Sequence, residues 1–329
     1  MPNCSRPSPW LIVFAAFLAL ALGSCTTAHH GPPISASADD PESTCCAGAD
    51  RYPAWLVRLA EAGAPVIVPV LGSIEVRPGW LERHPDAQAL IAARLKPLDI
   101  VAVVADGRAS LVPALFDHVA LYLGDADDVR EAGLWDDPRV KPHNAALREG
   151  PILIEAFRSG LRPQRIDQVI DVDAVAILRP TPYGRGNQTE AIGRGFGLIG
   201  MPFDFRFDQS TTECLFCTEA VMHAMPDLRV PTRVLYGRPT IMPDEMVHSA
   251  IVPRTRLRLA LYVKADRADW RQATADELAK DLEAAWRRYR GDASGRTCSS
   301  PAERASSTPG SRSAGPDKAR NWACQTRPR

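Results

Sequence analysis

Cys217 is the residue of this sequence best placed to act as a nucleophile. It stands where a polar stretch over 204–212 gives way to a short helical pattern that Pro226 ends. A cysteine at the start of a helix lies near exposed backbone N–H groups and the positive end of the helix dipole, which favour the nucleophilic thiolate. The position indicates a cysteine hydrolase or an acyltransferase, provided that the chain also supplies a base and a group that orients this base.

His118 and Glu155 are the candidates for the base and the orienting group. His118 begins an apolar run that predicts a strand, so its ring can face a cleft at the strand's edge. Glu155 lies inside another apolar run, where a carboxylate is costly unless it has a partner such as His118. Considered singly, His118 fits better as a structural residue that caps a strand, and Glu155 as one on the solvated face of an edge strand. His143 and His223 are no better placed to serve as the base.

The order of these three residues, with a histidine and a glutamate on strands before a cysteine at a helix start, resembles that of the circularly permuted papain-like amidases of the YaeF/YiiX type. These are relatives of the NlpC/P60 cysteine peptidases, in which the cysteine comes first. The similar blocks, in the family's order, are 95–100, 117–124, 153–156 with 160–162, Gly200-Met201-Pro202-Phe203-Asp204-Phe205, Phe216-Cys217-Thr218-Glu219-Ala220-Val221, and 243–246 with Ser249. The chain departs from the family pattern with Leu98 for glycine, Phe203 for tyrosine and Thr218 for serine. None of these changes removes a proposed catalytic group.

The resemblance implies a fold and a role for each of the three residues. The fold is α+β and circularly permuted papain-like (NlpC/P60-type), with a small antiparallel sheet or barrel packed with helices. Cys217 attacks a carbonyl carbon as thiolate, and its backbone N–H helps to hold the oxyanion. His118 takes the thiol proton and later protonates the leaving group, while Glu155 orients the imidazole. This mechanism needs no metal and no organic cofactor.

The periodicity of apolar residues predicts an α+β mixture around these positions. Strands are expected over 101–105, 118–124, 151–157, 174–178 and 256–263, helices over 80–95, 187–199, 217–225 and 274–290, and a turn over 125–128. Thr274 and Glu277 have the spacing of a capping box at the start of the last helix. The insertion between His118 and Glu155, rich in Asp and Arg, is expected to shape the substrate cleft.

Cys214 precedes the nucleophile with the spacing Cys-x-x-Cys. The chain lacks the βαβ context of a thioredoxin-like redox site around it, and no second Cys or His pair has the spacing of a zinc site. We therefore interpret Cys214 as a small buried residue, and we expect no disulfide between it and Cys217 in active protein. Four further cysteines, Cys45, Cys46, Cys298 and Cys324, lie in the predicted tails, where export would allow disulfides.

The two ends of the chain are expected to lie outside the catalytic fold. Residues 1–25 resemble a lipoprotein signal peptide that ends in Leu22-Gly23-Ser24-Cys25, with Cys25 as the lipidated residue. An ordinary secretory signal and an uncleaved anchor are the alternatives. The expected domains are a tether over 26–50, a helical segment over 51–94, the catalytic domain over 95–290 and a disordered tail over 291–329. A lipid on Cys25 would place the protein on the bacterial cell envelope, at the periplasmic side of the outer membrane in a Gram-negative host.

Three functions remain open at this stage. The balance of 39 basic and 39 acidic residues gives no reason to expect a nucleic-acid partner. The first hypothesis is a membrane-anchored cysteine amidase or peptidase that acts on cell-wall peptides or acylated small molecules. The second is an acyltransferase or thioesterase on lipid-like substrates, which shares the thioester intermediate. The third is a non-catalytic lipoprotein that keeps the fold to bind a ligand.

Overall fold

The structure is a computed structural model that describes residue 63 and residues 77–106, 114–181, 184–235, 237–252, 255–294, 296–298 and 324–326. The predicted signal segment, the tether and the lipid-site Cys25 lie outside these residues, as do Cys45 and Cys46. Within the described part of the chain, no helix is long and apolar enough to cross a membrane.

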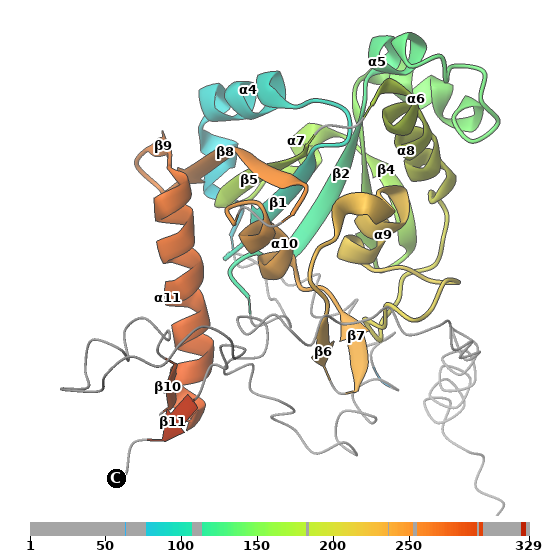
Figure 1. Ribbon diagram of the computed structural model, residues 1–329. Coiled ribbons are helices and arrows are strands. Elements are labelled where there is room, and N and C mark those ends of the chain that lie inside the picture. The colour runs from blue at the N-terminus through green and yellow to red at the C-terminus, as the bar shows by residue number, and fades with distance from the viewer. Residues whose placement is uncertain are drawn as a thin grey trace, which may run out of the picture.

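A seven-stranded antiparallel sheet forms the centre of the fold, in the order β4-β3-β2-β1-β5-β8-β9 (Figure 1). Its strands are β1 (Ile100–Val104), β2 (His118–Gly124), β3 (Ile152–Phe157), β4 (Gly160–Gln164), β5 (Ala174–Pro180), β8 (Leu257–Ala265) and β9 (Trp270–Gln272). Most of their side chains are apolar and buried, which explains why these segments pair as a sheet. The expected α+β mixture and antiparallel sheet are confirmed.

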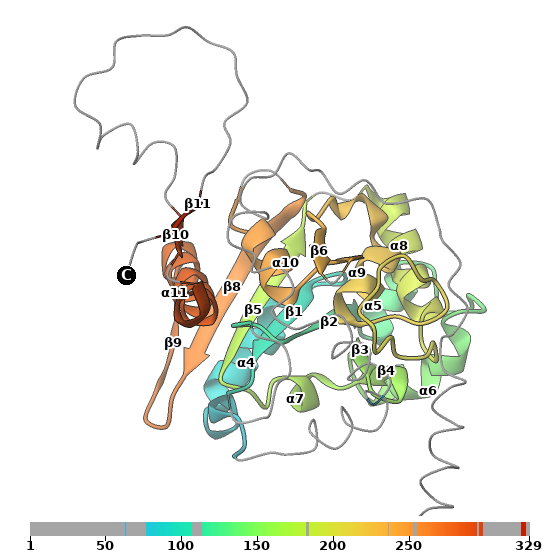
Figure 2. The same ribbon diagram turned by 90° about the horizontal axis from the view of Figure 1, so that it is seen from below.

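Helices cover both faces of this sheet (Figures 1 and 2). The helical elements are η1 (Trp80–Arg83), α4 (Pro85–Arg94), α5 (Ala126–Glu131), η2 (Lys141–His143), α6 (Asn144–Glu149), α7 (Ile166–Val169), α8 (Arg185–Gly197), α9 (Cys217–Ala224), η3 (Pro226–Leu228), α10 (Pro243–Ser249) and α11 (Ala275–Ser294). One core packs η1, α4 and α7 against one face, and a larger core joins α5, α6, α8, α9, α10 and α11 to the other. Two short ribbons complete the described elements: β6 (Arg233–Leu235) with β7 (Arg238–Thr240), and β10 (Arg296–Cys298) with β11 (Cys324–Thr326).

Strand register brings the two candidate residues on β2 and β3 to one face of the sheet. Ala120 on β2 lies opposite Glu155 on β3, and successive side chains on a strand alternate between faces. His118, two residues before Ala120, therefore shares a face with Glu155 as its diagonal neighbour. On β4, Arg162 lies directly opposite Glu155.

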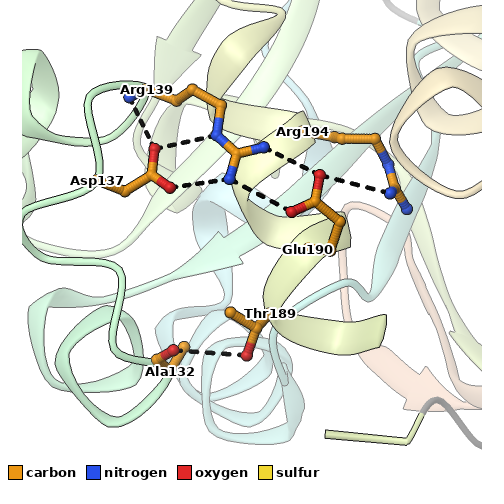
Figure 3. A network of polar contacts seen from close by, with 6 residues as sticks. All are labelled: Ala132, Asp137, Arg139, Thr189, Glu190 and Arg194. Carbon is orange, nitrogen blue, oxygen red and sulfur yellow. Dashed lines mark hydrogen bonds and ion pairs between the residues drawn. The ribbon is translucent and has the colours of Figure 1, made fainter. Parts of the chain in front are cut away.

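Polar contacts hold the insertion between β2 and β3 against α8 (Figure 3). Arg139 binds Asp137 within the insertion and Glu190 on α8, with N···O distances of 2.8 Å and 3.0 Å. Arg194, also on α8, approaches Glu190 and donates through Nε to the carbonyl of Ala224 at the end of α9, at 2.9 Å. The insertion, α8 and the helix that begins with Cys217 are thus linked by one chain of charged contacts.

The local predictions had mixed outcomes. The strand over 118–124 and the capping box of Thr274 and Glu277 are confirmed. The turn expected over 125–128 is wrong, because Asp125 caps α5 by accepting hydrogen bonds from the N–H groups of Asp127 and Asp128. Asp128 in turn accepts from the N–H of Asp125, so the acidic run starts a helix.

Candidate active site

Cys217 is the first residue of α9, and its side chain is the free thiol of the described part of the chain. The residue is 8% exposed and packs with the larger core. Phe216, which precedes it, has the extended backbone of a helix N-cap, at φ −98° and ψ 178°. Cys217 therefore lies at the start of a helix, where the N–H groups of the first turn have no partner within the helix.

The segment before Cys217 is a loop whose two ends are tied together. Phe203 and Leu215 form an isolated parallel bridge, and the N–H of Leu215 donates to the carbonyl of Pro202 at 2.9 Å. Within the loop, buried Asp204 accepts the N–H groups of Arg206 and Asp208, at 2.8 Å and 2.7 Å. These contacts set where α9 begins.

Thr218 anchors the same helix from its other side. The residue is fully buried, and its hydroxyl donates to the carbonyl of Ile241 at 2.6 Å, in the segment before α10. A serine at this position would have the same hydroxyl. Threonine in place of serine at position 218 therefore keeps the hydroxyl that makes this hydrogen bond.

His118 lies between Cys217 and Glu155. Its Nε2 atom is 3.3 Å from Oε1 of Glu155, and Cys217 lies close enough to the ring to raise the pKa of His118. Burial lowers the pKa of His118, but the hydrogen bonds and charges of Cys217 and Glu155 outweigh it and raise this pKa well above its ordinary value. The surroundings of the imidazole favour its charged form.

Glu155 also contacts Arg162, which the sequence pattern indicated only as part of a turn after the glutamate strand. Arg162 Nη2 donates to Oε2 of Glu155 at 3.2 Å, and its guanidinium lies 3.8 Å from the ring centroid of Phe157. Burial raises the pKa of Glu155, but His118 and Arg162 together bring it below its ordinary value. Glu155 therefore stays ionised. The only signal for Arg162 in the sequence is a basic residue soon after an acidic one across a tight turn.

The turn that carries Arg162 needs glycine at its start. Gly160 has φ +110°, and a Cβ atom there would lie 2.5 Å from the carbonyl oxygen of Met201. That close approach allows the N–H of Leu161 to donate to Met201 at 2.8 Å, and the N–H of Gly200 to donate back to Leu161 at the same distance. The β3–β4 turn is thereby fixed against the start of the loop that leads to Cys217.

The interpretation of Cys214 requires a correction. The residue is fully buried, as expected, but it is disulfide-bonded rather than a packing residue alone. Its partner is not Cys217, which is free, and the partner's side chain lies outside the described part of the chain. The sequence could not reveal this bond, because pairing depends on which segments meet in space. The expectation that Cys214 and Cys217 are not bonded to each other agrees with the structure.

The arrangement defines a class of chemistry. A thiol at a helix start, an imidazole beside it and an ionised carboxylate behind the imidazole form the set needed for nucleophilic attack on a carbonyl through a thioester. Among the described residues, no group of three or more His, Cys, Asp or Glu side chains could hold a metal ion. Fold and site together define a papain-like cysteine amidase in which the histidine and the glutamate precede the cysteine.

A family model agrees with this class. Residues 102–281 match the model described as "Permuted papain-like amidase enzyme, YaeF/YiiX, C92 family". The chain belongs to this family of permuted papain-like amidases. Neither a curated protein nor a solved structure matches the chain. The resemblance inferred from the sequence is therefore confirmed at the level of the family.

Proposed function

We propose that this protein is a cysteine amidase that cleaves an amide or ester through a thioester on Cys217, with His118 as acid and base and Glu155 as the orienting residue. The position of His118 between the other two residues is the observation that carries the proposal. Its imidazole lies 3.3 Å from Glu155, and Glu155 and Cys217 together raise the pKa of His118 well above its ordinary value. These contacts favour the imidazolium form of His118, which is the partner that a nucleophilic cysteine needs.

The reaction can be derived from that pair. The thiolate of Cys217 attacks the carbonyl carbon, and the N–H groups at the start of α9 face the oxyanion that forms. The bond to the leaving nitrogen breaks as His118 gives that nitrogen its proton. Water then loses a proton to His118 and attacks the thioester, which releases the acid and returns the sulfur as thiolate. Each proton taken by His118 is given back within the cycle.

The test is the reaction of Cys217 with iodoacetamide as a function of pH, read by mass spectrometry of the Cys217 peptide. An ordinary thiol of pKa about 8.5 is less than about 1% thiolate at pH 6. We expect the natural protein to react at pH 6 at least about tenfold faster than His118→Ala, with Glu155→Gln between them. Equal rates for the natural protein and His118→Ala would overturn the proposal, and would favour the non-catalytic alternative.

A second test looks for the acyl-thioester intermediate on Cys217. Incubation with a cell-envelope extract should leave an acyl adduct on Cys217 that intact-mass measurement detects, and Cys217→Ala should carry none. The mass of the adduct identifies the acyl half of the substrate, which we propose to be a cell-wall peptide or an acylated small molecule. An adduct of equal yield on Cys217→Ala would contradict the mechanism.

Transfer or hydrolysis of an acyl group from a lipid-like molecule is the second candidate, and an aromatic cluster favours it. Phe203, Phe205 and Phe207 lie half-buried in the loop before Cys217, and Phe207 packs 5.4 Å from the ring of Phe216. Such rings suit an apolar acyl chain. A matched pair of anilides, one with a long acyl chain and one with a short peptide, separates the two candidates by their kcat/KM.

Attachment to the cell envelope through a lipid on Cys25 remains part of the proposal, and it is supported by the sequence pattern alone. The test expresses the full chain in a bacterium with its own lipoprotein-processing enzymes. The mature protein should begin at Cys25, carry acyl groups and partition with membranes, and Cys25→Ala should lose all three properties. A mature N-terminus elsewhere would indicate an ordinary secretory signal.

A further inference from the structure

Asp244 on α10 is buried at 3% exposure, and its carboxylate contacts the segment just before His118. Oδ1 accepts the N–H of Phe116 at 2.7 Å, and Oδ2 accepts the N–H of Leu115 at 3.0 Å. Oδ2 also accepts the indole N–H of Trp286 on α11, at 2.7 Å. In Figure 1, α10 lies beside α11 and below the strands of the sheet.

Three N–H donors surround this buried carboxylate, and its ionised form accepts from all of them without placing a hydrogen against a donor. Burial outweighs the hydrogen bonds from Phe116, Leu115 and Trp286 and raises the pKa of Asp244 above its ordinary value. Hydrogen bonds of this kind to a charged acceptor are stronger than those between neutral groups. The arrangement therefore suits an anionic side chain that holds the backbone of Leu115 and Phe116 in place.

The sheet holds the backbone of His118 from one side only. His118 pairs with Val103 on β1, but the pairing of β2 with β3 starts only at Ala120, opposite Glu155. The catalytic candidate thus lies at the first residue of its strand, paired with β1 but before the pairing with β3 begins. The two residues that Asp244 holds are two and three positions before His118, so they fix the direction from which the strand begins.

We propose that Asp244 is a positioning residue, which holds the backbone before His118 so that the imidazole faces both Cys217 and Glu155, and that Trp286 makes α11 part of this support. The proposal rests on the proposed function of His118. Trp286 lies beyond residue 281, where the family match ends, whereas Asp244 lies within it. Leu278 and Leu282 bury the same helix against the larger core, and Trp286 packs against that core beside Asp244.

The chain offers a matched control on the same helix. Glu245 is the next residue, and it is also a buried carboxylate, but it binds Arg233 and the N–H of Met242 instead of the segment before His118. Asp244→Asn and Glu245→Gln each remove one buried charge from α10. A general role of α10 in stability would make the two changes act alike, whereas a positioning role would separate them.

The experiment measures the rate of iodoacetamide alkylation of Cys217 between pH 5 and 9 in the full chain, together with the thermal unfolding midpoint. In Asp244→Asn the amide N–H₂ faces a backbone donor, and loss of one such hydrogen bond is worth about tenfold. We expect about a tenfold slower alkylation at pH 6, with rates that approach the natural protein's toward pH 9. Glu245→Gln should keep the natural pH profile even where it lowers the unfolding midpoint.

Trp286→Phe is the second variant. It keeps an aromatic ring at this position but removes the indole N–H donor, and it tests the proposal even if Asp244→Asn does not fold. We expect its alkylation at pH 6 to slow by about two- to fourfold. A natural pH profile in both Asp244→Asn and Trp286→Phe, or an equal change in Glu245→Gln, overturns the positioning role. Failure of the proposed function would give a different result. In that case His118→Ala alone would alkylate Cys217 at the same rate as the natural protein, whatever the Asp244 variants show.

Discussion

Replacement of Glu219 by glutamine should stabilise the fold above neutral pH. Glu219 lies two residues after Cys217 on α9 and is 1% exposed. Its Oε2 is 3.4 Å from the N–H of Phe216, while Oε1 is 3.8 Å from His223 Nε2 and makes no hydrogen bond within the described part of the chain. Burial raises the pKa of Glu219 to about 7, with His223 opposing the rise and Asp204 adding to it.

The two pKa values of Glu219 decide the direction of the effect. The unfolded chain loses this proton near pH 4.5, whereas the folded chain keeps it until about pH 7. The free energy of unfolding therefore falls as pH rises through that window, because the folded state binds more protons. At about 1.4 kcal/mol for each pKa unit, the loss is about 3 kcal/mol above pH 7. Glutamine avoids the charge but weakens the contact with Phe216, which costs about 1 kcal/mol.

Urea unfolding followed by circular dichroism at pH 5, 6, 7 and 8, with disulfides kept intact, measures this effect. We expect Glu219→Gln to be about 2 kcal/mol more stable than the natural protein at pH 8, and equal or slightly less stable at pH 5. Glu131→Gln, on the exposed surface of α5, is the matched control and should show no such trend. A stability difference for Glu219→Gln that is the same at all four pH values would refute the reasoning.

Three further changes test the geometry of the site. Gly160→Ala forces a Cβ to within 2.5 Å of Met201 at φ +110°, so urea unfolding should show a loss of about 2 kcal/mol or more, and no loss would contradict the close approach. Arg162→Gln removes a donor that lowers the pKa of Glu155, so the acid limb of the alkylation profile of Cys217 should move to higher pH, and Arg162→Lys should restore part of it. Leu98→Gly relieves a φ of +74° worth about 1 kcal/mol but removes a buried side chain worth about 3 kcal/mol, so the unfolding midpoint should fall.

Much of the fold could be predicted because its apolar pattern is local. The apolar run over 118–124 predicted β2, and the order of His118, Glu155 and Cys217 resembles the family whose model the chain matches. The turn predicted over the acidic run 125–128 was wrong, because residues typical of turns are also typical of helix N-caps. Only the residues after such a run distinguish a turn from a helix, and here they form a short helix, α5, with one buried residue.

The contacts that position the candidate site residues could not be predicted. They join segments that are far apart in the chain or that meet only through strand pairing. Asp244 is 128 residues from Phe116, and nothing near either residue indicates the other. Arg162 meets Glu155 only once the β3–β4 register is known, and a shift by one residue would place them on opposite faces. The disulfide of Cys214 could not be predicted either, since the sequence indicated only that Cys217 is not its partner.

Leu98 holds a backbone conformation that usually favours glycine, the residue that the sequence resemblance led us to expect here. It adopts φ +74°, a region that glycine enters without strain. The neighbours enforce it: the N–H of Leu98 donates to Tyr122 on β2 at 2.7 Å, and the fully buried Asp99 accepts Nη2 of Arg179 at 2.6 Å. The first contact joins the start of β1 to β2, the strand that carries His118, and the second joins it to β5. Because neighbours on both sides hold this turn, the strained backbone of Leu98 persists.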